Sequence, residues 1–423
     1  MNAETELALA RLEEEAEQAD RDDPLTAARQ RFTIPEGVVY LDGNSLGALP
    51  RGAAETIERC VRREWGEGLV GSWNEAGWYE LPLRLGDRLA PIVGAEPGHL
   101  VVCDTTTLNL YKALGAALSL RRERRVVLVD GGDFPTNLYI TRSALAAAPG
   151  APECVELEPG EDPLARIAAL GDRLAAVAMS HVSYRTGAMR DLAAVTAAAH
   201  RQGALAVWDL CHSAGAMPLE LARSGVDFAV GCTYKYLNGG PGAPAWIYVA
   251  PCHLAECEQP LAGWMGHASP FDFEPRHRRH PGIRAFLCGT PHIVSMRGVE
   301  AGLATFDGID LAAVREKSMR LGELFRRAVE AARLPRVELA CPADPAARGS
   351  QVCFRHPRGY AVVQALIEQR VIGDFRAPDV MRFGFAPLYL RHVEALRAAR
   401  SLIGCVEAEV WRQERFARRA DVT

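Results

Sequence analysis

The chain has 423 residues, of which 48% are hydrophobic and 24% are charged, a composition typical of a globular protein with a large core. Its net charge of −5 provides no basic surface for nucleic acid, and it contains no apolar run long enough to cross a membrane. Eleven cysteines, an odd number without a Cys-x-x-Cys motif, favour reduced thiols in a cytoplasmic protein over disulfides or a metal site. The acidic N-terminal segment lacks the apolar stretch of a signal peptide.

The first hundred residues predict helices around one tight turn. Residues 2–32 are expected to form a helix that Pro35 ends, and a short strand at 38–41 leads into the turn Asp42–Gly47. A second helix is expected at about 51–65. A segment rich in aromatic residues and glycines follows. Trp73 within it either packs in the core or forms a wall of a site for a flat substrate.

From residue 100 onward, apolar strands alternate with helical patterns. The expected strands are 100–103, 125–130, 152–156, 174–180, 203–209, 226–232 and 245–250, and the clearest helices are 107–120, 162–172 and 189–202. Continuous apolar strands separated by helices predict an α/β fold with a mostly parallel sheet covered on both faces. In such a fold, ligands bind beyond the carboxyl ends of the strands.

The segments that follow the strands carry the polar residues. Residues 104–107 enter a helix with three threonines, which indicates either an anion site or ordinary N-capping. Residues 130–137 are expected to form a loop that exposes Phe134. The fourth strand ends at Ser180, and the fifth runs into Asp209 and His212.

The sixth strand delivers Tyr234 and Lys235 to a loop rich in glycine at 239–242. Lys235 is one of only three lysines among the 48 basic residues, so the chain uses arginine for nearly every other cation. A lysine amine can lose its proton and attack a carbonyl carbon, which arginine cannot do. A plain surface lysine at a strand end is the alternative.

Asp209 and Lys235 end consecutive strands, together with an anion-binding helix start and an exposed aromatic residue. These parts fit pyridoxal phosphate, whose aldehyde needs a lysine and whose ring nitrogen needs a carboxylate. The chain has no G-x-G-x-x-G or Walker motif that would indicate a dinucleotide or a nucleoside triphosphate. Taken alone, Asp209 fits a capping residue and His212 a structural histidine.

Several segments resemble the kynureninase family, and the resemblance covers nearly the whole chain. The segments that carry it are Leu41–Gly47, Phe134–Asn137, Trp208–Gly215, Val226–Gly240, Gly263–His267 and Arg382–Tyr389. The Tyr-Lys-Tyr-Leu-Asn block and the Gly-Asn-Ser-Leu-Gly turn distinguish this family from general aminotransferases.

The resemblance implies a fold-type-I, pyridoxal-phosphate-dependent enzyme with no metal. It implies a large domain at 36–300 with a seven-stranded, mostly parallel sheet, and a smaller α/β domain at 301–423 against which residues 1–35 pack. The implied activity is the hydrolysis of L-kynurenine to anthranilate and L-alanine in tryptophan catabolism, a pathway that leads to NAD biosynthesis. The implied assembly is a cytoplasmic homodimer with shared active sites.

The resemblance also implies roles for individual residues. Lys235 would be the Schiff-base lysine and then the general base, and Asp209 would be the partner of the ring nitrogen. Tyr234, beside the lysine, is the acid that we expect to protonate the departing alanine carbon. The residues that would hold or line the cofactor are Thr106, Thr107, Phe134, Asn137, Ser180, Asp209, His212, Tyr234, Lys235, Trp264 and Thr290.

On the substrate side, the resemblance implies that Arg382 clamps the α-carboxylate, for which its planar fork of donors is suited. Ser45 and Trp73 are weaker candidates for contact with the aromatic end of the substrate. Trp264 and Thr290 would reach the site from the neighbouring subunit.

Two other functions remain open at the level of sequence. A cysteine desulfurase-like enzyme would need a reactive cysteine on a mobile loop, and Cys341 is the loop-like candidate late in the chain. The second alternative is a non-catalytic protein that binds the cofactor, although the joint presence of Lys235, Asp209 and Arg382 argues against it. Kynurenine and 3-hydroxykynurenine are both candidate substrates.

Overall fold

The computed structural model describes residues 3–419 and contains two compact units. The larger unit consists of Ala53–Ser183 and Arg190–Leu303, and the smaller one combines the chain up to Gly52, Tyr184–Met189 and the chain from Ala304 onward. Residues 36–52 and 184–189 are thus grouped with the C-terminal region, whereas the domain boundaries expected from the sequence stay a prediction. Residues 1–2 and 420–423 of the predicted terminal segments lie outside the described residues.

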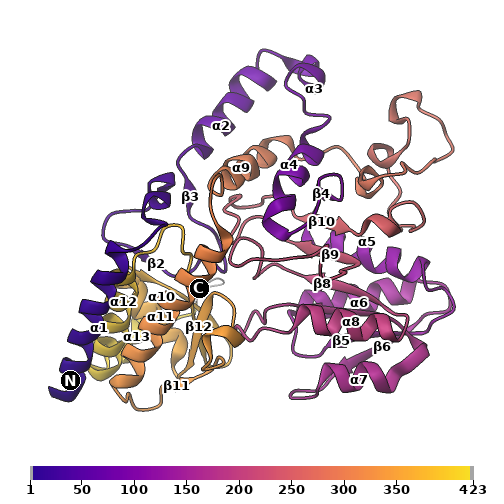
Figure 1. The fold of residues 1–423 in the computed structure, drawn as a ribbon. Helices are drawn as coiled ribbons and strands as arrows, with labels where there is room; N and C mark the ends of the chain where they lie inside the picture. The colour runs from indigo at the N-terminus through magenta and orange to yellow at the C-terminus, as the bar shows by residue number, and fades with distance from the viewer. Residues whose placement is uncertain (1–2, 420–423) are drawn as a thin grey trace. The chain divides into compact units, whose positions relative to one another are not determined.

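The larger unit is built on a seven-stranded sheet in the order β4-β10-β9-β8-β7-β5-β6 (Figure 1). Its strands are β4 Leu100–Val102, β5 Val126–Asp130, β6 Glu153–Leu157, β7 Leu174–Ser180, β8 Leu205–Asp209, β9 Phe228–Gly231 and β10 Trp246–Val249. The strands from β9 to β6 pair in parallel, and β10 is antiparallel to both of its neighbours. The predicted seven-stranded, mostly parallel sheet is confirmed.

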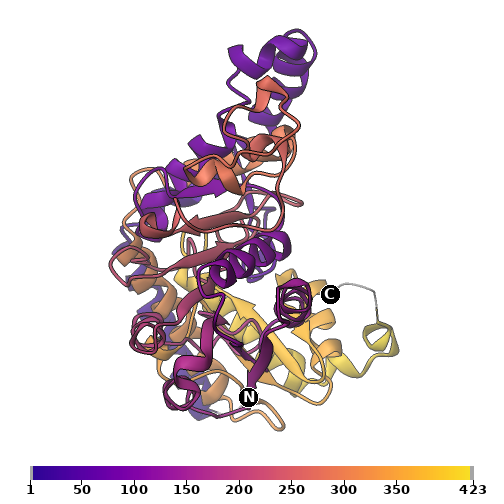
Figure 2. The same cartoon turned by 90° about the vertical axis from the view of Figure 1, so that its right-hand side faces the viewer.

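Helices cover this sheet because its strands are apolar on both faces (Figure 1 and Figure 2). Helix α5 (Thr106–Ser119) packs across β7, β8, β9 and β10, and Val207 of β8 belongs to the core on that side. The next residue, Trp208, points to the other face, where its indole donates a hydrogen bond to Thr196 of α8 (Leu192–Arg201). This alternation places the core on both sides of β8.

The larger unit contains further helical elements. They are α2 Ala53–Arg59, a π-helical turn at Cys60–Trp65, α3 Ser72–Glu75, α4 Leu81–Leu89, α6 Pro135–Ala147, α7 Pro163–Leu170 and α9 Ile293–Ala304.

The smaller unit contains a four-stranded antiparallel sheet in the order β11-β12-β15-β14 and a layer of helices. Its elements are α1 Ala3–Arg21, β1 Phe32–Thr33, β2 Val39–Tyr40, β3 Leu49–Pro50, α10 Leu311–Ala331, β11 Glu338–Leu339, β12 Gln351–Arg355, α11 Gly359–Glu368, β13 Val371–Ile372, β14 Asp374–Arg376, β15 Val380–Gly384, α12 His392–Glu407 and α13 Glu414–Ala417. The helices α1, α10 and α12 pack against one another.

Parallel pairing of β2 with β13 fixes the turn that follows β2. Leu41 donates its backbone N–H to Ile372, and Asp42 forms a β-bridge with Gly384 at the end of β15. The turn Asp42–Gly47 therefore lies against the carboxyl end of β15. Residues 184–189 join the same unit through hydrogen bonds that include Met189 N–H to Ala347 O, at 3.0 Å.

Two predicted helices are interrupted. The helix expected at 2–32 ends at Arg21 and resumes as a 3-10 turn at Thr26–Arg31, because Pro24 has no N–H to continue the ladder. The second is the long helical pattern that the sequence predicts at 301–335, which residues 305–310 divide: Gly308 has a φ of 70°, and Asp310 caps the new helix α10. None of the described helices is both long and apolar enough to span a membrane.

The contact between α4 and β4 depends on a glycine. A Cβ added at Gly86 would lie 2.2 Å from the carbonyl oxygen of Leu100, which is backbone and cannot rotate away. We expect Gly86→Ala to lower the free energy of unfolding by about 1–3 kcal/mol, measured by urea denaturation. The control is Gly404→Ala in α12, where a Cβ meets nothing within 4 Å and the stability should be unchanged or higher. Equal stability of the two variants would contradict this packing.

Candidate active site

The carboxylate of Asp209 lies at the carboxyl end of β8 and is held in place by two donors. Its Oδ2 accepts a hydrogen bond from Asn137 Nδ2 at 2.8 Å, and its Oδ1 accepts one from the backbone N–H of Cys211 at 2.8 Å. The residue is 9% exposed. A buried carboxylate with a fixed orientation can recognise one cationic or N–H partner.

Asn137 connects Asp209 to the neighbouring strand, because its Nδ2 also lies 3.3 Å from the hydroxyl of Ser180 at the end of β7. The expectation of a loop over 130–137 is wrong at its end, since Asn137 lies in the first turn of α6. Pro135 occupies the first turn of that helix, where its fixed φ and missing N–H are tolerated. The helix presents the amide of Asn137 to both strand ends.

Asp133 is a second buried carboxyl group at this edge, and the sequence analysis missed it. It accepts hydrogen bonds from the backbone N–H and the hydroxyl of Ser180 and from the N–H of Phe134. Burial, and then the charge of Asp209, raise its pKa to about 6. Asp133 thereby fixes the start of α6, and the acid directly before Phe-Pro was the only signal for it in the sequence.

Phe134 is the residue immediately before α6, and 45% of it is exposed. The exposed aromatic predicted at this loop is therefore present on the same rim as Asp209 and Asn137.

The amine of Lys235 follows β9 and lies 2.9 Å from Nε2 of His212. The other two lysines are committed to carboxylates: Lys112 pairs with Asp104 at 2.6 Å and Lys317 with Asp23 at 2.7 Å. Within residues 3–419, no carboxylate lies within ion-pair distance of Lys235. Lys235 thus differs from the two structural lysines, and its nitrogen faces an imidazole.

Tyr234 lies beside Lys235, whose amine is 5.9 Å from the centre of the tyrosine ring. The negative charge of Cys232 in its thiolate form, and then burial, raise the pKa of the Tyr234 hydroxyl. This hydroxyl therefore keeps its proton near neutral pH. Cys232 in turn contacts Cys211, whose thiol accepts the backbone N–H of Cys232 at 3.2 Å.

Helix α5 begins at Thr106, and its N-cap is Thr105, which the sequence analysis did not single out. The hydroxyl of Thr105 accepts the N–H of Leu108 at 3.3 Å, so the N–H groups of Thr106 and Thr107 remain at the open end of the helix. This geometry suits an anion. Asp104 precedes the cap with a φ of 47° and is anchored by Lys112.

Two predicted residues lie on exposed segments of the same unit. Trp264 is 40% exposed and packs edge-on against Phe271, with ring centres 5.9 Å apart. Thr290 is exposed as well. Trp73 lies in α3 and packs edge-on against Trp78 with ring centres 5.8 Å apart, as the core-packing alternative predicts.

The smaller unit holds Arg382 in a cluster that we call the Arg382 cluster, formed by Asp42, Ser45, Asp374, Arg376 and Arg382. Arg382 is 1% exposed and forms a two-pronged ion pair with Asp374, in which Nε donates to Oδ1 at 2.6 Å. It also donates to the backbone carbonyl of Tyr184 and to the hydroxyl of Ser45. Asp374, which the sequence analysis missed, is the cross-strand partner of Arg382 in the β14–β15 pair.

Asp42 is the second acid of the Arg382 cluster. Burial, and then the charge of Asp374, raise its pKa from 3.8 to about 8. Its Oδ1 is buried and accepts no hydrogen bond from the described residues. With Asp42 neutral near neutral pH, Arg376 and Arg382 face a single ionised carboxylate, Asp374, so the cluster carries one excess positive charge.

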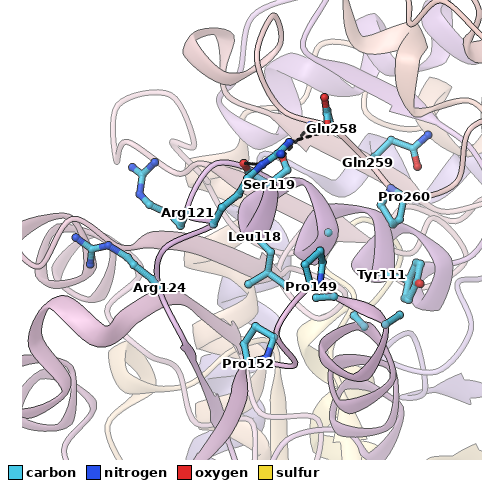
Figure 3. Close-up of a pocket in the computed structure, with 15 residues that line it drawn as sticks. Tyr111, Leu118, Ser119, Arg121, Arg124, Pro149, Pro152, Glu258, Gln259 and Pro260 are labelled. Carbon is cyan, nitrogen blue, oxygen red and sulfur yellow. Dashed lines mark hydrogen bonds and ion pairs between the residues drawn. The ribbon is translucent and has the colours of Figure 1, made fainter.

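A pocket of about 390 Å³ lies elsewhere in the larger unit, at the C-terminal ends of α5 and α6 (Figure 3). Its lining is mainly apolar, with Tyr111, Leu118 and Pro149 among the contacts. Arg121 and Arg124 at its edge donate to the backbone carbonyls of Gly203 and Gln202. None of the predicted site residues lines this pocket, which lies at the ends of α5 and α6 remote from the carboxyl ends of the strands.

Comparison with known proteins identifies the family. Residues 314–402 match the family model for the kynureninase C-terminal domain. The kynureninase of Burkholderia pseudomallei strain 1106a is 48% identical over 416 residues, which cover 97% of this chain and 99% of that protein. The chain belongs to the kynureninase family. The kynureninase of Pseudomonas fluorescens is 46% identical over 409 residues, covering 96% of this chain and 98% of the relative.

Solved structures of more distant proteins share the fold. A cysteine desulfurase from Thermococcus onnurineus NA1 has a TM-score of 0.76 at 17% identity and covers 90% of this chain and 98% of its own. A C-DES mutant with glycine covalently linked to the PLP cofactor has a TM-score of 0.75 at 21% identity. The match covers 89% of this chain and 98% of that structure's chain. This kynureninase-family chain therefore has the predicted fold-type-I architecture.

The raised pKa of Asp42 predicts a pH effect on stability. The folded protein keeps a proton on Asp42 between pH 3.8 and about 8 that the unfolded chain releases, so this group lowers stability as the pH rises through that window. Asp42→Asn removes the titrating carboxyl group and with it this loss of stability at high pH. Its thermal midpoint relative to the unaltered protein should be higher by a few degrees at about pH 9 than at about pH 5.

The control for this experiment is Asp172→Asn, an exposed acid outside the Arg382 cluster, which should give the same relative midpoint at both pH values. A difference for Asp42→Asn that does not change with pH would show that Asp42 is ionised throughout.

Proposed function

We propose that this chain is a pyridoxal-phosphate-dependent hydrolase that converts L-kynurenine, and by extension 3-hydroxykynurenine, to anthranilate or its hydroxylated analogue and L-alanine. Membership of the kynureninase family at 48% identity supports the reaction. The observation that carries the chemistry is the position of Lys235, the described lysine that faces an imidazole instead of a carboxylate, one strand away from the buried Asp209.

The residues at the carboxyl ends of the strands fit this cofactor by the chemistry of their donors and acceptors. A lysine amine suits its aldehyde, and the fixed Asp209 carboxylate suits a protonated ring nitrogen. The open N-terminus of α5 at Thr106 and Thr107 suits a phosphate. Phe134 would cover the ring, and the residues that would line the rest are Asn137, Ser180, His212, Tyr234, Trp264 and Thr290.

The chemistry that bound pyridoxal phosphate supplies is a carbonyl that condenses with amines and a ring that stabilises negative charge. Around it, Asp209 would hold the proton on the ring nitrogen, since two hydrogen bonds keep its carboxylate in one orientation. Nζ of Lys235 would take the α-proton of the substrate as general base. His212 Nε2, at 2.9 Å, would orient that amine.

Cleavage between Cβ and Cγ leaves a carbon of alanine that must gain a proton. Tyr234 supplies it in this proposal, because it precedes Lys235 in the chain, its ring lies beside the lysine amine, and its raised pKa keeps the hydroxyl protonated. Arg382 remains our candidate for the substrate carboxylate end, and Ser45 and Trp73 remain our candidates for the aromatic end. Arg382 provides a buried guanidinium whose plane is already fixed.

The proposed assembly is a homodimer with shared active sites. It is supported by aromatic side chains at the surface of the larger unit, where Tyr79, Trp264 and Phe273 surround Phe271 with ring centres 5.5–6.4 Å apart. Phe271 and Phe273 are 58% and 77% exposed. An apolar group of this kind usually marks a contact with another chain. Trp264 and Thr290 would reach the partner's site from it.

We also propose a cytoplasmic enzyme of tryptophan catabolism without nucleic-acid or membrane partners. The eleven cysteines, most of them buried among apolar side chains, suit a reducing compartment. The domain division that we propose remains 1–35 with 301–423 against 36–300.

A cysteine desulfurase is the second candidate reaction, because the fold is shared with such enzymes. Cys341 does not favour it. Its thiol accepts the backbone N–H of Cys353 at 3.5 Å, and burial raises its pKa, so it is a poor nucleophile.

The direct test compares two substrates. The purified protein loaded with pyridoxal phosphate should release fluorescent anthranilate from L-kynurenine, with alanine formed in equal amount. Incubation with cysteine and a reductant should release sulfide slowly or not at all. Cys341→Ser serves as the matched control and should keep the kynurenine activity within about twofold, since the thiol only accepts a backbone hydrogen bond. Rapid sulfide release without anthranilate would establish the desulfurase instead.

A further inference from the structure

The guanidinium of Arg382 has two edges, and the structure uses them differently. The side edge, formed by Nε and Nη2, faces both oxygens of Asp374 in two parallel hydrogen bonds. Among residues 3–419, the end edge, formed by Nη1 and Nη2, donates to the carbonyl of Tyr184 and the hydroxyl of Ser45. The end edge therefore has neutral partners, whereas the side edge has a charged one.

The contact of Arg382 with Ser45 is the weakest of these. It measures 3.2 Å, and the same hydroxyl donates its proton to Asp374 Oδ2 at 2.6 Å. A carboxylate at this position would replace a neutral acceptor with a charge-assisted one, which is a stronger bond. The end edge of Arg382 is thus the side on which an incoming carboxylate gains most.

The charges of the Arg382 cluster leave room for such an anion. Asp374 is ionised, since Arg382 lowers its pKa against the opposing effect of burial. Arg376 also pairs with Asp374, at 2.9 Å. With Asp42 protonated near neutral pH, two arginines face one carboxylate, and one positive charge remains unbalanced.

We propose that Asp374 is a positioning residue that grips the side edge of Arg382 and aims its end edge at the α-carboxylate of the substrate. The inference rests on the proposed function, and it assigns to Asp374 an orienting role through Arg382. The two residues are direct cross-strand partners in the β14–β15 pair, so the backbone holds the carboxylate in register with the guanidinium. Two parallel bonds also fix the plane of the guanidinium, which a single bond does not.

The alternative is that Asp374 competes with the substrate for the guanidinium. The two roles predict opposite effects of its removal. Without an orienting Asp374 the guanidinium rotates and recognises carboxylates less well, whereas without a competing Asp374 it recognises them better.

The test uses the protein loaded with pyridoxal phosphate and two ligands that differ only at the carboxylate, L-alanine and L-alaninamide. The dissociation constant of each is measured from the change in cofactor absorption, and their ratio gives the preference for a carboxylate. Asp374→Ala should lower this preference by about tenfold or more, because both parallel bonds are lost. Asp374→Asn keeps the shape and one acceptor oxygen, and should lower it by about threefold.

The matched control is Glu394→Ala. Glu394 on α12 is a similarly buried acid that holds Arg29 through two hydrogen bonds of 2.8 and 2.9 Å. Its loss removes a comparable ion pair, so it should affect stability but leave the alanine-to-alaninamide preference unchanged. Arg382→Ala should abolish the preference.

An unchanged or increased preference in both Asp374 variants would overturn the orienting role, and an increase would establish competition. An unchanged preference in Arg382→Ala would overturn the role of Arg382 as the carboxylate clamp and the inference with it. Kynurenine cleavage by the unaltered protein is measured separately. If no anthranilate forms although the alanine preference responds as predicted, the proposed reaction fails and the inference about Asp374 stands.

Discussion

The parallel pairing of β7, β8 and β9 is the constraint on which the candidate active site depends. In this register Ser180 lies opposite Asp209, and Asp209 lies opposite Val230, a few residues before Lys235. Neighbouring parallel strands end at the same edge of a sheet, so the side chains that directly follow these strands lie close together without long connecting loops. Hydrogen bonds from Asn137 to both strand ends then convert proximity into fixed geometry.

Two buried acids, Asp133 and Asp374, support the residues that we propose to act on the cofactor and the substrate. Asp133 holds Ser180 and the N–H of Phe134, and Asp374 holds Arg382. Their environments differ in charge: burial and Asp209 raise the pKa of Asp133 to about 6, whereas Arg382 lowers that of Asp374. A buried carboxylate costs free energy unless it is paired, which explains why each accepts several hydrogen bonds.

The fold was predictable because its signals are local. Six of the seven strands are apolar runs up to their last residue, and β6 at the sheet edge is the exception with two glutamates. The predictions that failed concern the ends of helices. Pro24 divides the first helix, and Pro35 was taken instead as its end. Pro135 starts a helix where a loop was expected, which places Asn137 in α6.

The sequence predicted those residues of the candidate site whose residue type is rare in this chain. Lys235 stands out because the chain has three lysines, and the structure separates it from Lys112 and Lys317 by their carboxylate partners. Asp133 and Asp374 were missed because the chain contains 53 acidic residues, and burial is a tertiary property that no local pattern reveals.

The central claim, that Lys235 is the residue joined to the cofactor, has a direct test. Borohydride reduction of the loaded protein, followed by digestion and mass spectrometry, fixes the cofactor to the amine that carries it. The account predicts a single labelled peptide containing Lys235, and loss of the label in Lys235→Ala with the fold retained. A label on Lys112 or Lys317, or no label on any lysine, would contradict it.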